Sequence, residues 1–255
     1  MSKIRKLAGK IKRRVFQTRN KARLKRYKEK LLSLKDIHKG KRCFIVGNGP
    51  SLNVNDLEKL KGEICFGTHR IYNIFDKTDW RPTYYCAQDY NLVRSSIDDI
   101  KRLDAEIKFI AMLQNQRYPS ISNATFIKMV CERFYPDLPK FSEDLAQDGI
   151  YEGFTVSYMC LQIAAYMGFS EIYLLGVDHS YSKVMLPNGE VLSATNVDDH
   201  FSENDKLENI PQLYKSTLAY KKANCYAKEN GIKVLNATRG GELEAFERVD
   251  FDSLF

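Results

Sequence analysis

Residues 43–51 read Cys-Phe-Ile-Val-Gly-Asn-Gly-Pro-Ser, an apolar run that ends in a glycine-rich turn. The apolar half is typical of a buried strand, and either Ser51 or Asn53 is suited to cap a helix that carries Leu57 and Leu60. A strand, a glycine turn and a helix N-terminus together can hold phosphate, because free N–H groups and the helix dipole favour an anion. The turn matches neither the dinucleotide-binding fingerprint nor the Walker loop with its lysine. It therefore predicts either a phosphate site of another kind or an ordinary tight turn.

Strands and helices are predicted to alternate along the chain after this turn. Apolar runs predict strands at 43–46, 63–67, 83–87, 107–112, 124–129, 171–175 and 232–235. Helices are predicted at 55–61, 91–103, 154–167 and 207–230. This alternation predicts that residues 41–255 form one α/β domain, a Rossmann-like and mostly parallel sheet with helices on both faces. Residues 179–206 are polar and too long for an ordinary connection, which indicates a lid-like segment.

Residues 1–40 are expected to form a separate basic arm. Residues 1–42 contain 18 Lys or Arg and two acidic residues, whereas the remainder of the chain contains 22 basic and 30 acidic residues. A helix is predicted over 2–34, with apolar residues at helical spacing among the basic ones: Ile4, Leu7, Ile11 and Val15. A basic amphipathic helix of this kind can lie on an anionic membrane surface. The alternatives are a solvated arm, a helix packed on a partner subunit, and an RNA-binding tail.

The remaining composition limits the classes of function. The body of the chain is acidic, so the domain itself is not expected to bind nucleic acid. The six cysteines form no C-x-x-C pair, so we expect them to be reduced and no zinc to be bound. The sequence shows no secretory leader and no run of about 18 apolar residues. The expected location is cytoplasmic, peripheral at the inner face of the membrane.

Polar side chains follow the predicted strands at the edge where open parallel sheets bind ligands. They are Asn48, Ser51, Thr68, His69, Arg70, Gln88, Asp89, Asp178, His179, Ser180 and Tyr181. Because the carboxyl ends of parallel strands meet at one edge, we expect these side chains to converge. His200 follows two acidic residues in the lid-like segment, and an imidazole beside carboxylates suits a general base near neutral pH. The alternative for His200 is a solvated loop residue.

Several segments resemble the 6-hydroxymethylpterin diphosphokinase MptE-like family. They are Gly47-Asn48-Gly49-Pro50-Ser51-Leu52, Thr155-Val156, the run from Gly168 to His179, and the run from Asn236 to Gly241. The first segment and the Gly-Phe-x-Glu-Ile-Tyr-Leu-x-Gly-Val-Asp pattern are also similar to bacterial sialyltransferases. The resemblance extends over about residues 41–251 and implies a GT-A-like Rossmann domain.

The sialyltransferase resemblance implies an inverting, metal-independent glycosyltransferase that needs no cofactor. It would transfer an acidic sugar from a CMP-activated donor to a glycan or glycolipid acceptor, and it implies self-association. In that chemistry His200 is the catalytic base and Tyr181 supports the departing phosphate. The strand ends and the resemblance together give these nucleotide-binding residues: Gly47, Asn48, Gly49, Pro50, Ser51, His69, Arg70, Gln88, Asp89, Thr155, Gly176, Asp178 and His179.

The label of the family implies a different reaction. A diphosphokinase would transfer diphosphate from ATP to a pterin or a related small molecule with Mg²⁺, and Asp89 and Asp178 would be candidate metal ligands. The absence of a Walker lysine and the presence of a basic arm favour the glycosyltransferase. A third interpretation is a non-catalytic assembly protein, with a degenerate nucleotide-binding fold that docks through its arm.

Overall fold

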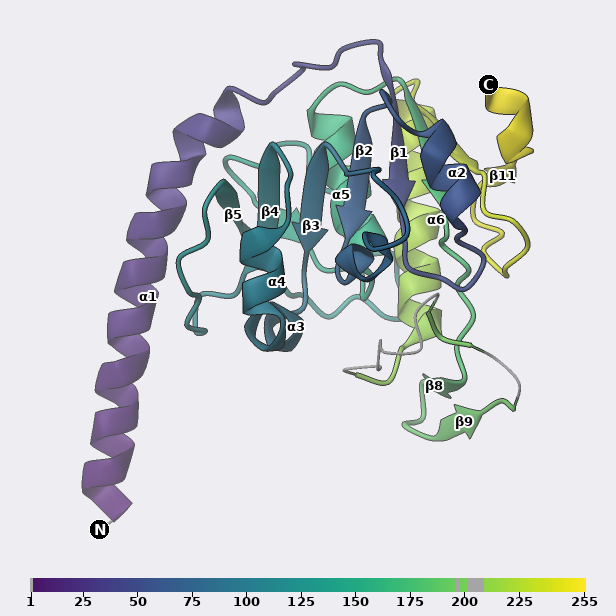
Figure 1. The fold of residues 1–255 in the computed structure, drawn as a ribbon. Coiled ribbons are helices and arrows are strands. Elements are labelled where there is room, and N and C mark those ends of the chain that lie inside the picture. Colours follow the sequence, from purple (N-terminus) through teal and green to yellow (C-terminus); the bar gives the residue numbers. More distant parts are fainter. Residues whose placement is uncertain (1, 196–197, 201–208) are drawn as a thin grey trace.

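Nine parallel strands form one continuous sheet in the order β11-β10-β7-β1-β2-β3-β4-β5-β6 (Figure 1). A computed structural model describes residues 2–195, 198–200 and 209–255, and for residues 2–8 and 11–12 it describes the backbone alone. The strands are β1 (Arg42–Val46), β2 (Cys65–Thr68), β3 (Tyr84–Ala87), β4 (Ile107–Met112), β5 (Ala124–Val130), β6 (Ile150–Tyr151), β7 (Glu171–Leu175), β10 (Lys233–Asn236) and β11 (Glu247–Arg248). The predicted Rossmann-like α/β fold is confirmed.

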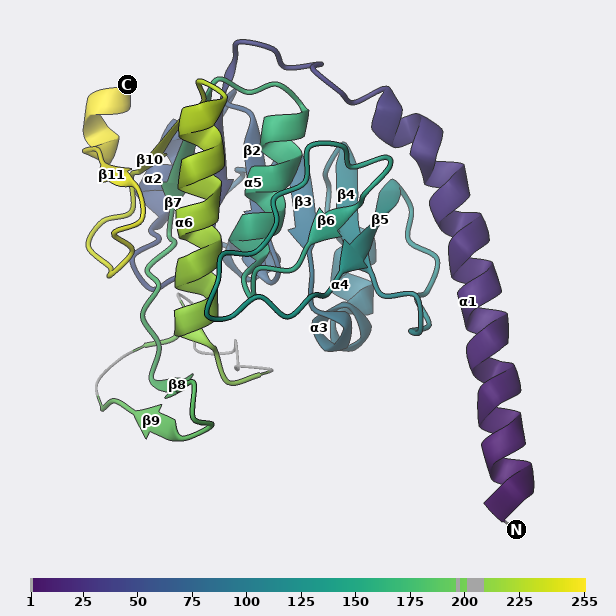
Figure 2. The same ribbon diagram turned by 180° about the vertical axis from the view of Figure 1, so that it is seen from behind.

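Helices cover both faces of this sheet, as the sequence predicts (Figures 1 and 2). One face carries α2 (Val54–Lys59), α3 (Tyr90–Ser95) and α4 (Ile97–Arg102), with a 3₁₀ turn at Ile71–Ile74. The other face carries α5 (Val156–Tyr166) and α6 (Leu213–Glu229). Strands β2, β3 and β4 are buried along their whole length because both of their faces are covered. A hairpin of β8 (Lys183–Met185) and β9 (Val191–Ser193) and a 3₁₀ turn at Phe251–Leu254 complete the elements.

The N-terminal helix, α1 (Ser2–Leu32), lies along β5 (Figures 1 and 2). Its C-terminal half contacts the domain: Leu31 is buried, and the Tyr27 ring lies 5.7 Å from that of Phe126. Val15, a member of the predicted apolar stripe, is 44% exposed, whereas the side chains of Ile4, Leu7 and Ile11 lie outside the described part of the chain. No helix among the described residues is long and apolar enough to cross a membrane.

The order of the strands fixes where a ligand can enter. Strand β1 pairs with β2 on one side and with β7 on the other. The strands from β2 to β6 are added on one side of β1, and β7, β10 and β11 are added on the other. The chain continues from β1 to α2 on one face of the sheet and from β7 to α6 on the other, and the carboxyl ends of two such strands are the usual ligand position in open α/β sheets.

Candidate functional site

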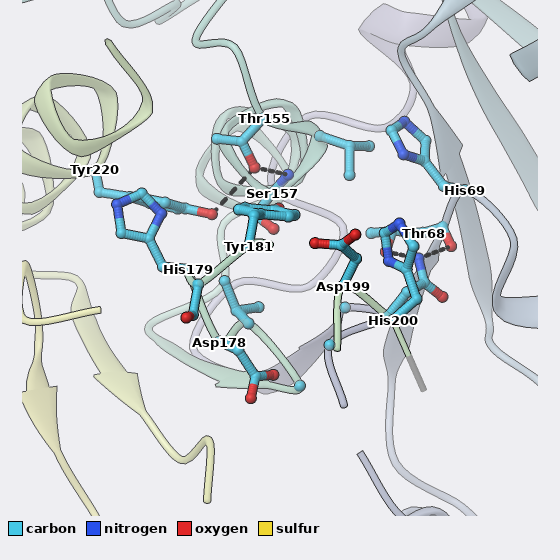
Figure 3. A pocket seen from close by; sticks show the side chains of 17 residues that line it. Thr68, His69, Thr155, Ser157, Asp178, His179, Tyr181, Asp199, His200 and Tyr220 are labelled. Atoms are coloured by element: carbon cyan, nitrogen blue, oxygen red, sulfur yellow. Dashed lines mark hydrogen bonds between the residues drawn. The ribbon is translucent and has the colours of Figure 1, made fainter. Parts of the chain in front are cut away.

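A cleft lies at these strand ends and has two connected parts, of which Figure 3 shows the inner one. The inner part has a volume of about 80 Å³ and the outer part about 520 Å³. Seven residues line both parts and join them: Asn48, His69, Thr155, Val156, His179, Tyr181 and His200. The polar strand ends predicted from the sequence thus converge on one cleft.

The glycine turn after β1 packs against the end of β7. The amide of Gly49 donates to the carbonyl of Gly176 at 2.9 Å, and the hydroxyl of Ser51 donates to Asp178 Oδ2 at 2.7 Å. A Cβ atom on Gly49 would clash with the Asp178 carboxylate, so glycine is required there. The amide of Ser51 also bonds this carboxylate. Of the two alternatives for this turn, these bonds favour the ordinary tight turn.

The helix that follows this turn does not begin at the cleft, because neither Asn53 nor any residue of α2 lines it. Asn53 is the cap of α2, and its side-chain oxygen accepts from the amide of Asp56 at 2.9 Å. The six residues of α2 give it a small dipole. Of the two candidate caps, Asn53 is the one observed, whereas Ser51 bonds Asp178 instead.

Asp178 joins three segments that are distant in sequence. Its carboxylate accepts from Ser51, and its backbone carbonyl accepts from the amide of Glu242 at 2.7 Å. The side chain is nearly buried, and desolvation raises its pKa although the bonds from Ser51 oppose that shift. The structure therefore gives this carboxylate a role in joining loops.

The helix N-terminus that faces the cleft belongs to α5. Thr155 caps this 11-residue helix by accepting from the amide of Ser157, and its hydroxyl also lies 3.1 Å from that of Tyr220. Thr155, Val156 and Ser157 all line the inner part of the cleft (Figure 3). The first amides of a helix and its dipole attract anions. Phosphate binding is thus better supported at α5 than at α2.

Tyr181 and His200 both lie in the predicted lid-like segment, and both line the two parts of the cleft. The carboxylate of Asp199 accepts from the amide of Ser182 at 2.6 Å and from its hydroxyl at 2.7 Å, which ties residues 198–200 to the segment after Tyr181. Burial raises the pKa of Tyr181, so its phenol is a hydrogen-bond donor at neutral pH. Residues 196–197 and 201–206 of the predicted lid-like segment lie outside the described residues.

His179 is the first histidine after β7, and it also lines the cleft. Burial lowers the pKa of His179 to about 4, so its ring is neutral at pH 7. Its Nε2 atom lies 2.8 Å from the hydroxyl of Thr217 on α6. His179 can therefore shape the cleft and share a hydrogen bond, but it does not bring positive charge to a phosphate.

The outer part of the cleft offers acceptor atoms. Asn48 Nδ2 donates to the carbonyl of Thr68 at 2.9 Å, and His69 Nε2 accepts from the amide of Gln88 at 3.4 Å. Two side-chain oxygens, Asn48 Oδ1 and Gln88 Oε1, are buried and have no hydrogen-bond partner among the described residues. Buried acceptors are nearly always satisfied, so these two fit a ligand that donates hydrogen bonds.

The two candidate magnesium ligands are engaged by the protein. Asp89 caps α3 by accepting from the amides of Asn91 and Leu92, and its Oδ2 accepts from Asn209 Nδ2 at 2.6 Å. Asp178 lines the inner part of the cleft and Asp89 the outer part. Within the described ranges, no group of three or more His, Cys, Asp or Glu is placed to hold a metal ion. Both carboxylates are thus bonded to protein groups, in separate parts of the cleft.

Thirteen of the fifteen predicted site residues line the cleft. The exceptions are Pro50 and Ser51, which lie in the turn that packs on β7. Sequence reasoning missed Ser157 and Tyr220, which line the inner part. The pattern Gly-Phe-Thr-Val-Ser before α5 is a cap signal that could have pointed to Ser157, whereas Tyr220 lies on a helix with no local signal.

Comparisons with known proteins agree with this fold. No curated protein matches the sequence significantly. The structure is similar to that of the MAf glycosyltransferase from Magnetospirillum magneticum AMB-1, with 14% sequence identity and a TM-score of 0.52. The match covers 90% of this chain but only 38% of that protein, and at this identity it concerns the fold alone. The 6-hydroxymethylpterin diphosphokinase MptE-like family matches residues 17–184, well over half of the chain, and the protein therefore belongs to that family.

Proposed function

We propose that the protein is a glycosyltransferase that transfers an acidic sugar from a CMP-activated donor to a glycan or glycolipid acceptor. The observation that carries the proposal is the joint presence of the α5 N-terminus, Tyr181 and His200 around one cleft. The amides at the start of α5 can bind a phosphate, and the hydroxyl of Tyr181 can donate a hydrogen bond to it. His200 can act as the base. The likeness of the fold to a glycosyltransferase structure supports this choice.

The reaction is an inverting displacement at the anomeric carbon. His200 accepts the proton of the acceptor hydroxyl while the hydroxyl oxygen attacks that carbon. The bond from the anomeric carbon to the phosphate oxygen breaks, and CMP leaves with the electron pair. The amides at the start of α5 and the phenol of Tyr181 stabilise the charge that gathers on the phosphate. The two unpartnered acceptors, Asn48 Oδ1 and Gln88 Oε1, receive hydrogen bonds from the nucleoside.

The proposal extends to the surroundings of the enzyme. The protein works at the inner face of a membrane, reaches an anionic surface through residues 1–34, and associates with copies of itself. It requires neither a metal ion nor nucleic acid. Each of these statements is open to direct measurement on the full-length chain.

Nucleotide binding provides the first test of the function. The full-length protein is heated with CMP, CDP, UDP, GDP, ADP or ATP, each with and without Mg²⁺. A ligand at about 100 times its Kd stabilises the fold by about 2.7 kcal/mol, which a thermal shift detects readily. We expect a shift with CMP that does not depend on Mg²⁺. If no nucleotide shifts the Tm, the function is a non-catalytic assembly role.

Replacement of the base tests the mechanism separately. His200→Ala is expected to lower the rate of donor turnover by about 10²–10⁴, which is the usual contribution of a general base. The variant should keep the thermal shift with CMP, because the phosphate and nucleoside contacts lie elsewhere. A turnover close to that of the wild type would remove His200 from the mechanism.

A second candidate is the diphosphokinase that the family name describes. It requires ATP and Mg²⁺, whereas Asp89 and Asp178 are bonded to protein groups in separate parts of the cleft. A thermal shift that needs ATP and Mg²⁺ together, and is abolished by EDTA, would favour this candidate over the glycosyltransferase.

A further inference from the structure

A third cavity lies where β5 and β6 end. Its volume is about 210 Å³, and its lining includes Val130 and Tyr151, the last residues of these two paired strands. Glu152, which directly follows β6, lines both this cavity and the outer part of the cleft, so the two adjoin there. The cleft and this cavity thus lie along the carboxyl edge of the sheet from β1 to β6.

Hydrogen bonds fix the backbone that carries Glu152. Gln162 on α5 is fully buried; its Oε1 accepts from the amide of Tyr151 at 2.9 Å, and its Nε2 donates to the carbonyl of Tyr151 at 3.0 Å. The amide of Glu152 donates to the carbonyl of Val130 at 3.0 Å. The wall between the two cavities is therefore preformed, as is usual for small-molecule sites.

The carboxylate of Glu152 keeps capacity to accept hydrogen bonds. It makes no ion pair in the described part of the chain. The thiol of Cys131 bonds it, but a thiol is a weak donor. Because an ionised carboxylate has about four acceptor positions, Glu152 can bind a ligand that donates hydroxyl groups.

The other residues of the third cavity favour a ligand with polar edges and apolar faces. Phe134 and Tyr151 contribute aromatic side chains to its lining. Its charged residues are three carboxylates and two cations: Glu132, Asp137, Glu152, Arg133 and Lys140. The excess of negative charge disfavours a second phosphate group. A saccharide fits this lining, because its hydroxyls donate to carboxylates and its C–H faces pack on aromatic rings.

Glu152 is also close to the phosphate site along the chain. It stands three residues before Thr155, the cap of α5, and three extended residues span at most about 11 Å. Phe154, which lies between them, has a φ of 57°, a conformation that bulky side chains rarely adopt and that is concentrated at functional sites. A ligand bound at Glu152 therefore adjoins the part of the cleft that Phe154 and His200 line.

We propose that Glu152 and the third cavity bind the acceptor, which is a saccharide of at least two sugar units because it spans two cavities. The acceptor enters at the β6 end of the sheet, its hydroxyls donate hydrogen bonds to the carboxylate of Glu152, and its terminal hydroxyl reaches His200. The donor enters from the β1 end. This assignment rests on the proposed function and adds to it the position and the minimum length of the acceptor.

Saccharide binding tests the role of Glu152. The fluorescently labelled full-length protein is applied, with and without CMP, to an array of immobilised mono- and oligosaccharides. The variant Glu152→Ala is compared with Glu143→Ala, which removes an exposed carboxylate that lines none of the three cavities. We expect the wild type and the control to bind oligosaccharides and Glu152→Ala to bind them about tenfold more weakly or less, the effect of a hydrogen bond to a charged group.

Two results of the array would overturn the proposal. One is that the wild type binds no oligosaccharide, or binds monosaccharides equally well. The other is that Glu152→Ala and Glu143→Ala bind alike.

Two native cysteines test the position of the acceptor. Cys131 is exposed and its thiol bonds Glu152, whereas Cys225 is exposed on α6 and lines none of the three cavities. The unsubstituted protein is treated with N-ethylmaleimide, and the modification of each cysteine is followed by mass spectrometry. An oligosaccharide that binds on the array should slow the reaction at Cys131 and leave that at Cys225 unchanged. Equal rates at Cys131 with and without the oligosaccharide would overturn the position.

The same variant separates this proposal from the proposed function. Glu152→Ala should show the same thermal shift with CMP as the wild type, because the phosphate site is at Thr155 and the start of α5. A CMP shift in a wild type that binds no oligosaccharide contradicts the acceptor site alone. Oligosaccharide binding that depends on Glu152, without any nucleotide shift, contradicts the glycosyltransferase alone.

Discussion

Two glycine turns lead into helices beside the same cleft, and they differ in what they face. We call the turn over Gly47–Ser51 closed because Gly49 donates a hydrogen bond to Gly176 and Ser51 donates one to Asp178, both within the protein. The turn over Gly153–Ser157 also packs on the protein at Gly153, but it places the cap and the first residues of its helix in the lining of the inner part of the cleft, whereas no residue of α2 lines the cleft. A glycine-rich sequence thus marks a close approach of backbone, and the approaching group can be the protein itself.

The largest expected effect comes from a substitution for which the closed turn has no room. Gly49→Ala places a Cβ atom against the Asp178 carboxylate and 2.9 Å from the carbonyl of Gly176. We expect the free energy of unfolding to fall by about 3 kcal/mol or more, as measured by urea denaturation. Gly9→Ala is the control, because nothing lies within 4 Å of the added atom. Equal stability of the two variants would show that the closed turn yields easily.

The pH dependence of the free energy of unfolding tests whether His179, which lines the cleft beside both turns, is buried as a neutral imidazole. Burial lowers the pKa of His179 to about 4, whereas the unfolded side chain titrates near 6.5, so protonation favours the unfolded chain. The stability that neutral His179 contributes is complete above pH 6.5 and declines toward pH 4, by up to about 3 kcal/mol. His179→Asn tolerates the backbone φ of 57° and removes the titration. Urea unfolding at several pH values should therefore show a shallower acid decline for the variant, and identical declines would contradict a buried neutral imidazole.

A matched pair of serines provides the finest test. Ser51→Ala removes a bond to a nearly buried carboxylate and should lower the free energy of unfolding by about 2 kcal/mol, with the affinity for CMP unchanged. Ser157→Ala changes the wall of the inner cleft and should weaken CMP about tenfold, the effect of one hydrogen bond, with a smaller loss of stability. Urea denaturation and titration calorimetry separate the two effects. If Ser51→Ala weakened CMP binding and Ser157→Ala did not, the turn over Gly47–Ser51 would be the phosphate site instead.

The sheet could be predicted from sequence because its strands are short apolar runs with both faces buried. The seven predicted strands correspond to β1, β2, β3, β4, β5, β7 and β10. The strands that sequence reasoning missed, β6, β8, β9 and β11, have two or three residues each, too few for a pattern. The predicted helix at 91–103 is two helices, α3 and α4, which meet at Ser96. The last helix begins at Leu213, just after Pro211, and residues 207–208 of its predicted range lie outside the described residues.

The site could be predicted only in part. The strand order brings the polar strand ends to one edge, which a parallel sheet dictates without knowledge of side-chain contacts. The bond between Ser51 and Asp178 could not be predicted, because it depends on tertiary packing and both residues are equally plausible ligand groups. The same limit applies to Asp89. Its sequence position makes it a candidate metal ligand, whereas in the structure its carboxylate caps α3.

The pairing of β1 with β7 has a consequence for the order in which the molecule is built. Ser51 and Asp178 are 127 positions apart, so a ribosome must release most of the chain before the closed turn finds its partner. Closing such a long loop is slow compared with forming the neighbouring pair of β1 and β2. An incomplete chain that ends before β7 would expose one margin of β1, a hydrogen-bonding edge of the kind that chaperones shield during synthesis.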